Sequence, residues 1–288
     1  MTIAAGFRFA DGILLCADTQ ITYEGIAKVS GTKILPFEFK RSALKVVFTF
    51  SGDVSYAKGG IQACVRKIKK LEPPTIALED VESAISESLN SYFQNLVYKH
   101  PHYKMPGGPD FWLIVGIWSP KDGLGLYETA DAVVTKVSDG DKFAMTGIGA
   151  TLGRYLAKPM MLHSGYSMSD IGTVSTHFLS EVKEHVDGCG KGSELIVLSK
   201  DGLFSSIGGL GTAHIEDVFG AIQNSINLMF LDLCDLEKPG DEAVVERLKT
   251  LHMLVVSCRQ HMLKEAEKHR GMLRLLDILM GWKVRKIE

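Results

Sequence analysis

The sequence predicts an α+β protein with two stacked β-sheets and a helix pair outside each sheet, a four-layer α/β/β/α sandwich with a C-terminal helical extension. The first observation is the order of the expected elements, which is strands, two helices, strands, two helices, strands. The second is periodicity, because apolar residues recur at steps of three and four in some segments and alternate in others. Strands and helix pairs that are segregated along a chain favour helices packed on the outer faces of sheets.

Strand signals dominate the first fifty residues. Residues 2–17 alternate and then become continuously apolar around an Ala-Asp-Gly turn at 10–12, which is typical of two paired strands. Residues 25–36 indicate a short hairpin ending in KILPF, and LKVVFTFSGD at 44–53 indicates a strand that leads to a glycine. The chain therefore enters a sheet almost at its first residue.

Two helices are expected next. Apolar positions spaced by three and four predict an amphipathic helix from 54 to about 71, which the Pro pair at 73–74 ends. A second helix is expected from about 75 or 80 to 98. The segment 99–110 is dense in Pro and Gly and indicates an irregular loop.

The same alternation is repeated further along the chain. Four strands are expected within 111–146, then helices at about 150–162 and 167–187, then a strand-turn-strand at 193–207. The GIGATLG stretch within this part has glycines in a phosphate-loop-like spacing. We interpret it as a strand-to-helix turn, because no Lys-Ser/Thr pair or acidic partner follows it.

The last part of the chain is expected to be mostly helical. Helical periodicity covers 214–236 and 241–281, with EKPGDE between them as a breaker. We therefore predict a sandwich domain over 1–210 and a helical extension over 211–288. The apolar stripe of the extension is expected to pack on the domain or on a neighbouring subunit.

Composition excludes several classes of protein. With 32 basic and 34 acidic residues the net charge is −2, which is not typical of a nucleic-acid binder. No apolar run reaches the 18 or so residues that a membrane span needs.

Five widely spaced cysteines without a C-x-x-C, and an N-terminus without signal-peptide features, favour a cytoplasmic protein. His100 with His102, and His185 with Cys189, lack a full ligand set, so no metal and no cofactor is expected.

Thr2 is the candidate nucleophile. A hydroxyl needs a neighbouring base, and an N-terminal threonine carries one, because an α-amino group has a pKa of about 7.7–8.0. Methionine aminopeptidases remove Met before small residues, so Thr2 is expected to become the mature terminus. Taken alone, Thr2 is better explained as a strand-forming residue, and only its combination with other residues favours the catalytic interpretation.

The opening motifs resemble a known family. The segments TIAAGFRFADGILLCADTQIT, GTKIL and FTFSGD are similar to the start of a proteasome β-type subunit, within the N-terminal nucleophile (Ntn) hydrolases. DTQIT is particularly similar to the bacterial proteasome-like threonine peptidase that works with a ring ATPase. The resemblance implies Thr2 as nucleophile, Asp18 as supporting carboxylate and Lys33 as the lysine that tunes the amine. Lys28 is the weaker alternative, because Lys33 lies in an apolar strand.

The resemblance also implies substrate-binding positions. Thr22 matches a residue whose backbone pairs with an extended substrate, and Ser51 matches a pocket-lining residue. The backbone N–H at Thr49 would hold the oxyanion, although the family usually has Gly there. A Gly-Ser-Gly of the family is Gly-Ile-Gly at 147–149 here, and a later supporting Asp and Ser correspond to Asp187 and Gly190.

These residues together predict a threonine-type endopeptidase. Its expected substrate is a peptide or unfolded protein, cleaved through an acyl-enzyme on Thr2 inside a homo-oligomeric ring, with an ATPase unfoldase as a possible partner. Loss of the family's serine positions at Ile148 and Gly190 leaves a catalytically weak or inactive structural subunit as an alternative. A small-amide hydrolase with the same chemistry is the other alternative.

Overall fold

The computed structural model describes residues 2–23, 27–71, 76–105, 108–161, 166–207, 209–234, 242, 245–257, 260 and 285–287. The chain divides into two compact units, Met1–Gly209 with Val284–Glu288, and Leu210–Lys283. The first unit contains antiparallel sheets and helices, so the predicted α+β class is confirmed.

One sheet has five strands in the order β10-β1-β2-β11-β12, and its strand pairs are antiparallel. All seven residues of β2 are buried, which explains why GILLCAD is continuously apolar up to its final aspartate. The strands are β1 (Ala4–Phe9), β2 (Gly12–Asp18), β10 (Phe143–Thr146), β11 (Ser193–Ser199) and β12 (Phe204–Ile207).

The second sheet has six strands in the order β13-β5-β6-β7-β8-β9. Its pairs are antiparallel except that β13 runs parallel to β5. The strands are β5 (Ile34–Phe39), β6 (Leu44–Gly52), β7 (Phe111–Ser119), β8 (Gly123–Ala130), β9 (Val133–Lys136) and β13 (Arg285–Ile287). A separate hairpin joins β3 (Gln20–Tyr23) to β4 (Ala27–Ser30).

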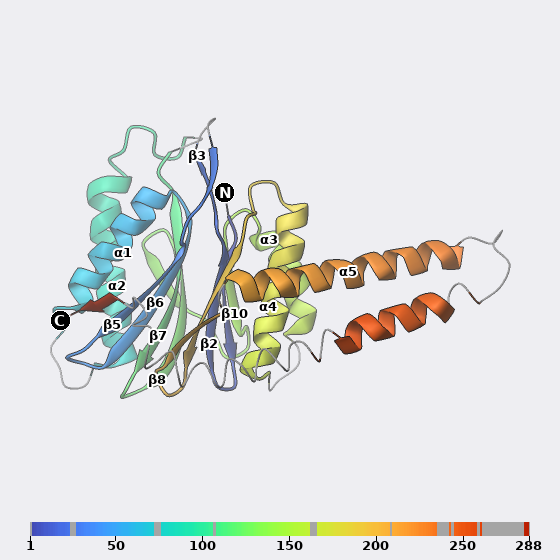
Figure 1. The fold of residues 1–288 in the computed structure, drawn as a ribbon. Coiled ribbons are helices and arrows are strands. Elements are labelled where there is room, and N and C mark those ends of the chain that lie inside the picture. The colour runs from blue at the N-terminus through green and yellow to red at the C-terminus, as the bar shows by residue number, and fades with distance from the viewer. Residues whose placement is uncertain are drawn as a thin grey trace. The chain divides into compact units, whose positions relative to one another are not determined.

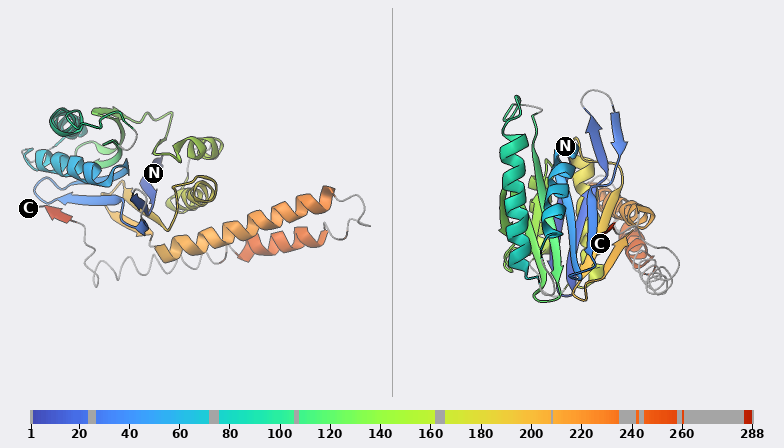
Figure 2. Two further views of the ribbon diagram at one scale, coloured as in Figure 1. Left: turned by 90° about the horizontal axis from the view of Figure 1, so that it is seen from above. Right: turned by 90° about the vertical axis from the view of Figure 1, so that its left-hand side faces the viewer.

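Two helix pairs accompany the sheets, as Figures 1 and 2 show. They are α1 (Val54–Ile68) and α2 (Leu78–Tyr92), which a short π-helical segment η1 (Phe93–Val97) continues, and α3 (Ala150–Met160) and α4 (Met168–His185). One apolar cluster joins α1 and α2 to the six-stranded sheet, for example through Ile61 and Phe48. Another joins α3 and α4 to the five-stranded sheet, for example through Phe178 and Leu14.

A third apolar cluster lies between the two sheets and contains inward-facing side chains of both. Leu15 of β2 and Ile114 of β7 belong to it, and both are fully buried. Burial on both faces of each sheet fixes the register of the strands, because a slip of one residue would exchange the two faces. The register in turn fixes which side chains meet at the ends of the strands, where the candidate site lies.

The second unit is helical in its described residues. It contains most of α5 (Gly209–Cys234) and helical residues at 245–257. Of the helical segment expected over 241–281, the structure describes residues 242, 245–257 and 260, and the rest lies outside the described residues. No helix in the described segments is both long enough and apolar enough to cross a membrane.

Candidate functional site

The structure brings Thr2, Asp18 and Lys33 together. The Lys33 Nζ donates to Asp18 Oδ1 at 2.8 Å, and the Thr2 hydroxyl hydrogen-bonds both the Asp18 carboxylate and the Lys33 ammonium. The exposed fractions are 3% for Thr2, 0% for Asp18 and 2% for Lys33. A hydroxyl, a carboxylate and an ammonium group therefore share one enclosed site.

Strand pairing explains how the three residues meet. Thr2 lies two residues before β1, and Asp18 ends β2, which is antiparallel to β1 with Ala4 opposite Ala17. This register places the ends of both strands together, and the Asp18 N–H donates to the Ile3 carbonyl at 3.2 Å. Lys33 directly precedes β5 in the other sheet. The site thus lies where the two sheets meet.

The Asp18 carboxylate accepts further hydrogen bonds from the main chain. Ile3 N–H donates to its Oδ1 at 3.0 Å, and the N–H groups of Gln20 and Gly190 donate to its Oδ2 at 3.3 and 3.1 Å. A buried carboxylate is tolerated only when it is paired and hydrogen-bonded. The main chain at Gly190 therefore supports the Asp18 carboxylate without a side-chain hydroxyl at that position.

Burial lowers the pKa of Lys33, and the nearby Asp18 carboxylate partly opposes this by favouring the charged ammonium. Lys33 also donates its backbone N–H to Glu194 Oε2 at 3.1 Å. Lys33 is thus fixed in position but holds its proton less tightly than a surface lysine does. Lys28, the alternative lysine, is exposed on β4.

The Gly-Ile-Gly turn at 147–149 holds the backbone of Thr2. Gly149 N–H donates to the Thr2 carbonyl at 3.3 Å. Gly147 has φ +96°, and a Cβ there would lie 2.2 Å from the Thr2 carbonyl oxygen. The turn joins β10 to α3, so these glycines permit a close backbone approach.

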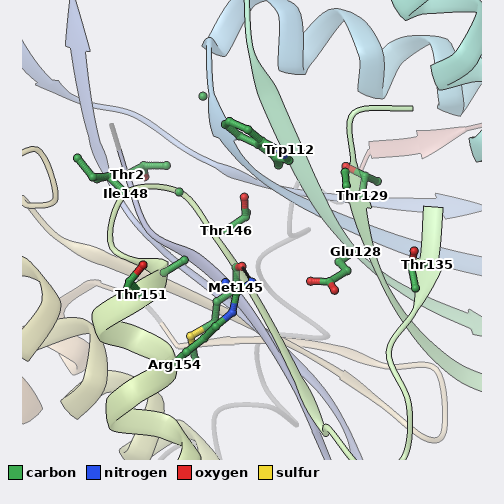
Figure 3. Close-up of a pocket in the computed structure, with 14 residues that line it drawn as sticks. Thr2, Trp112, Glu128, Thr129, Thr135, Met145, Thr146, Ile148, Thr151 and Arg154 are labelled. Carbon is green, nitrogen blue, oxygen red and sulfur yellow. Dashed lines mark hydrogen bonds between the residues drawn. The ribbon is translucent and has the colours of Figure 1, made fainter. Parts of the chain in front are cut away.

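Two cavities adjoin Thr2. Both Thr22 and Ser51 line the smaller one, of about 210 Å³, and the Ser51 hydroxyl lies 2.9 Å from that of Thr146. Figure 3 shows the larger one, of about 660 Å³. It is lined by Thr2, Gly52, Trp112, Glu128, Thr129, Ala130, Thr135, Met145, Thr146, Gly147, Ile148, Ala150, Thr151 and Arg154.

Two of the expected site residues are not brought to Thr2. Thr49 is fully buried on β6 and lines neither cavity, and its side-chain oxygen has no hydrogen-bond partner among the described residues. Asp187 is exposed in the turn after α4. No hydrogen bond or ion pair links it to the site within the described part of the chain.

Gly52 is a site residue that the sequence reasoning missed. It lines both cavities together with Thr2 and has φ +94°. The glycine that closes FTFSGD, directly before a predicted helix, was the available signal. Among the described residues no group of three or more His, Cys, Asp or Glu side chains could hold a metal ion.

The sequence matches no protein-family model and no curated protein. Similar solved structures include an Anbu (Gly-1) mutant from Hyphomicrobium sp. strain MC1, at 10% identity and TM-score 0.65, covering 82% of this chain and 100% of that one. Anbu from Yersinia bercovieri, described as an ancestral beta-subunit, is 11% identical with TM-score 0.65, covering 83% and 98%. A helical assembly of the Anbu complex from Pseudomonas aeruginosa is 13% identical with TM-score 0.63, covering 83% and 97%.

These likenesses correct the assignment made from the opening motifs. The chain was expected to be a proteasome β-type subunit similar to the bacterial threonine peptidase that works with a ring ATPase, and this identification is wrong. The similar structures are of Anbu. The error arose because the assignment rested on short motifs within residues 2–53, which are too few to distinguish one protein of this fold from another. What the likeness shows is that this chain has a proteasome-like fold.

Proposed function

We propose that this chain is an N-terminal threonine peptidase that acts after removal of Met1. The observation that carries the proposal is the buried group of Thr2, Asp18 and Lys33 beside two cavities. A threonine hydroxyl that contacts both an ammonium and a carboxylate in an enclosed site is arranged for nucleophilic chemistry.

The proposed reaction forms an acyl-enzyme on Thr2. The Thr2 hydroxyl oxygen attacks the peptide carbonyl, and its proton passes to the freed α-amino group of the same residue. The tetrahedral intermediate collapses, the amine product leaves with that proton, and an ester remains on Thr2. Water then hydrolyses the ester with the same amine as base. The Lys33 ammonium would stabilise the developing alkoxide, and Asp18 would hold Lys33 in place.

For the oxyanion we propose the backbone N–H of Gly52 in place of Thr49. Gly52 lines both cavities next to Thr2, whereas Thr49 lines neither. Preorganised backbone donors stabilise the charge that develops on the carbonyl oxygen, and losing one typically costs about 10²–10³ in kcat. Thr22 and Ser51 would contact an extended substrate in the smaller cavity.

Intact-mass spectrometry with an electrophile selective for N-terminal threonine tests the proposal. We expect purified protein to lack Met1 and to gain one adduct on Thr2. Thr2→Ala should gain none and should lose cleavage of internally quenched peptides. Thr250→Ala is the matched control, because Thr250 is an exposed threonine that lines neither cavity beside Thr2.

Two outcomes would contradict the proposal. Equal peptide turnover by wild type and Thr2→Ala would exclude Thr2 as the nucleophile. An adduct without any peptide turnover would favour the inactive structural subunit or the small-amide hydrolase, and a panel of small amides would separate those two.

The proposal extends to the assembly. We propose that the chain self-associates and confines its sites, and an Anbu neighbour is described as a helical assembly. A peptide or unfolded protein would be the substrate. Four further expectations stay predictions. They are a ring arrangement, an ATPase unfoldase as partner, a cytoplasmic location, and packing of residues 211–288 against the domain or a neighbouring subunit. The described cysteines Cys16, Cys64 and Cys189 are free.

A further inference from the structure

The larger cavity beside Thr2 contains a carboxylate that the proposed chemistry does not use. Glu128 lies on β8, opposite Ile114 of β7 and Thr135 of β9. Ile114 belongs to the apolar cluster between the sheets, and so does Leu126, two residues before Glu128 on the same face of β8. Glu128 therefore occupies a half-buried position on the inner face of the sheet, next to apolar positions of β7 and β8 and to Thr135 of β9.

A half-buried charge beside apolar positions is stabilised by a partner of opposite charge. In the part of the chain that the structure describes, Glu128 has no ion pair and its carboxylate accepts no hydrogen bond. Instead it lines the cavity of about 660 Å³ that also contains Thr2. Figure 3 shows its carboxylate directed into that space. The fold thus leaves the carboxylate available to a molecule that enters the cavity.

Arg154 is the cation that lines the same cavity, from α3 on the opposite wall. Its guanidinium donates to the Met145 carbonyl at 2.7 Å and makes no ion pair with Glu128. An arginine bound to a main-chain carbonyl leaves Glu128 unneutralised. The positive charge of Arg154 also repels a basic substrate side chain on that side of the cavity. This repulsion would direct such a side chain toward Glu128.

We infer that Glu128 selects substrates with a lysine or arginine side chain next to the scissile bond, bound in the larger cavity. This inference rests on the proposed function and names the substrate class of that same site. A basic side chain would place its aliphatic part along Trp112 and its charged end at Glu128. A charge-assisted contact of this kind in a partly enclosed site discriminates strongly between charged and neutral analogues.

The test uses internally quenched peptides that differ at one residue, scanned across both sides of the scissile bond. Arginine is compared with citrulline, and lysine with norleucine, because these pairs differ mainly in charge. We expect wild type to favour the charged member by roughly tenfold in kcat/KM, and Glu128→Gln to lose that preference. Glu128→Lys should reverse it toward glutamate. The control is Glu87→Gln, the same change on an exposed residue of α2, which should leave the preference intact.

A binding measurement separates the failure of this inference from failure of the proposed function. Fluorescence anisotropy of the same labelled peptides is measured on wild type, Thr2→Ala and Glu128→Gln, and needs no turnover. Tighter binding of basic peptides that is lost only in Glu128→Gln supports the inference, even if no Thr2-dependent cleavage is found. The inference is overturned if charged and neutral peptides bind equally, or if the preference for charged peptides persists in Glu128→Gln. Neither result decides whether cleavage depends on Thr2.

Discussion

Lys33 and Asp18 form a buried pair in which each residue compensates the charge of the other. Removing one partner leaves an uncompensated buried charge. We expect Lys33→Met to lower the free energy of unfolding by about 3–5 kcal/mol, and the double variant Asp18→Asn/Lys33→Met to recover part of that loss. Urea denaturation followed by circular dichroism measures both. Lys67→Met, which removes the exposed Lys67–Glu87 pair, should cost about 0–1 kcal/mol. A loss no larger for Lys33→Met than for this control would contradict the pairing.

The lowered pKa of Lys33 predicts a pH dependence of stability. Its ordinary pKa is 10.5, and burial lowers the value in the folded state. Between the two values the unfolded chain binds more protons than the folded chain, so the free energy of unfolding contributed by Lys33 rises with pH. The excess stability of wild type over Asp18→Asn/Lys33→Met should therefore increase as pH approaches 10.5 and decrease toward neutrality. Urea titrations at several pH values measure it, and a constant difference would show that Lys33 keeps its ordinary pKa.

Alanine substitutions at Gly147 and Gly123 would separate the cost of backbone strain from the cost of a steric clash with a neighbouring residue. Both have positive φ, +96° and +76°, but a Cβ at Gly147 would meet the Thr2 carbonyl at 2.2 Å, whereas nothing lies within 4 Å of one at Gly123. We expect Gly123→Ala to cost about 1–2 kcal/mol from backbone strain alone and to keep activity. Gly147→Ala should cost more and should remove Thr2-dependent turnover. Peptide assays at matched folded fraction check this, and an active Gly147→Ala would show that the Thr2 backbone tolerates displacement.

At the scale of elements, the start of α1 connects stability to the site. Asp53 is its N-cap and accepts hydrogen bonds from the Ser55 and Tyr56 N–H groups at 2.8 and 3.0 Å. Asp53 also lines the smaller cavity and directly follows Gly52. We expect Asp53→Ala to cost about 1 kcal/mol and to raise KM. Thermal denaturation and steady-state kinetics measure the two effects.

The control for this prediction is the equivalent cap of another helix. Ser167 caps α4 and accepts from the Asp170 N–H at 3.3 Å, but it lines neither cavity beside Thr2. Ser167→Ala should lower stability by a similar amount with KM unchanged. If both variants changed KM equally, the effect would come from general stability and not from the position of α1.

The strands and helices could be predicted from the sequence, but only some of the site residues could. The strands and helices were predictable because burial on known faces leaves a period of 2 or 3.6 in the sequence. Asp18 and Lys33 were placed by short motifs at strand ends. Gly52 was not placed, and Gly190 was interpreted only as the loss of a serine, because a contribution from a backbone N–H group can come from any residue and no side-chain pattern marks it. Glu128 was missed because one acid in a strand becomes informative only when the pairing register puts it on an inner face.

At the scale of the whole molecule, exposed apolar side chains on the second unit predict self-association. Leu231, Val245, Leu248, Met253, Val255 and Val256 are between 39% and 66% exposed. Apolar groups of this extent mark interaction surfaces in many proteins. We expect sedimentation at several times the 31.6 kDa of one chain, and a smaller assembly for Leu231→Glu/Met253→Glu. The control Lys249→Glu changes an exposed charge on the same segment and should keep the assembly. A monomer at all concentrations would contradict the proposed confinement of the sites.

The enclosure of Thr2 has a consequence for the order of events during biosynthesis. An aminopeptidase must take the first residues into its own active site, but once folded the Thr2 hydroxyl contacts Asp18 and Lys33 and its carbonyl accepts from Gly149. Chain growth at about 5–20 residues per second delivers residues 147–149 many seconds after Thr2. If Met1 is removed as proposed, we expect its excision to be most efficient before those residues arrive. Overproduction beyond the capacity of the aminopeptidase is then expected to give two populations, which intact-mass spectrometry would separate by the mass of one methionine.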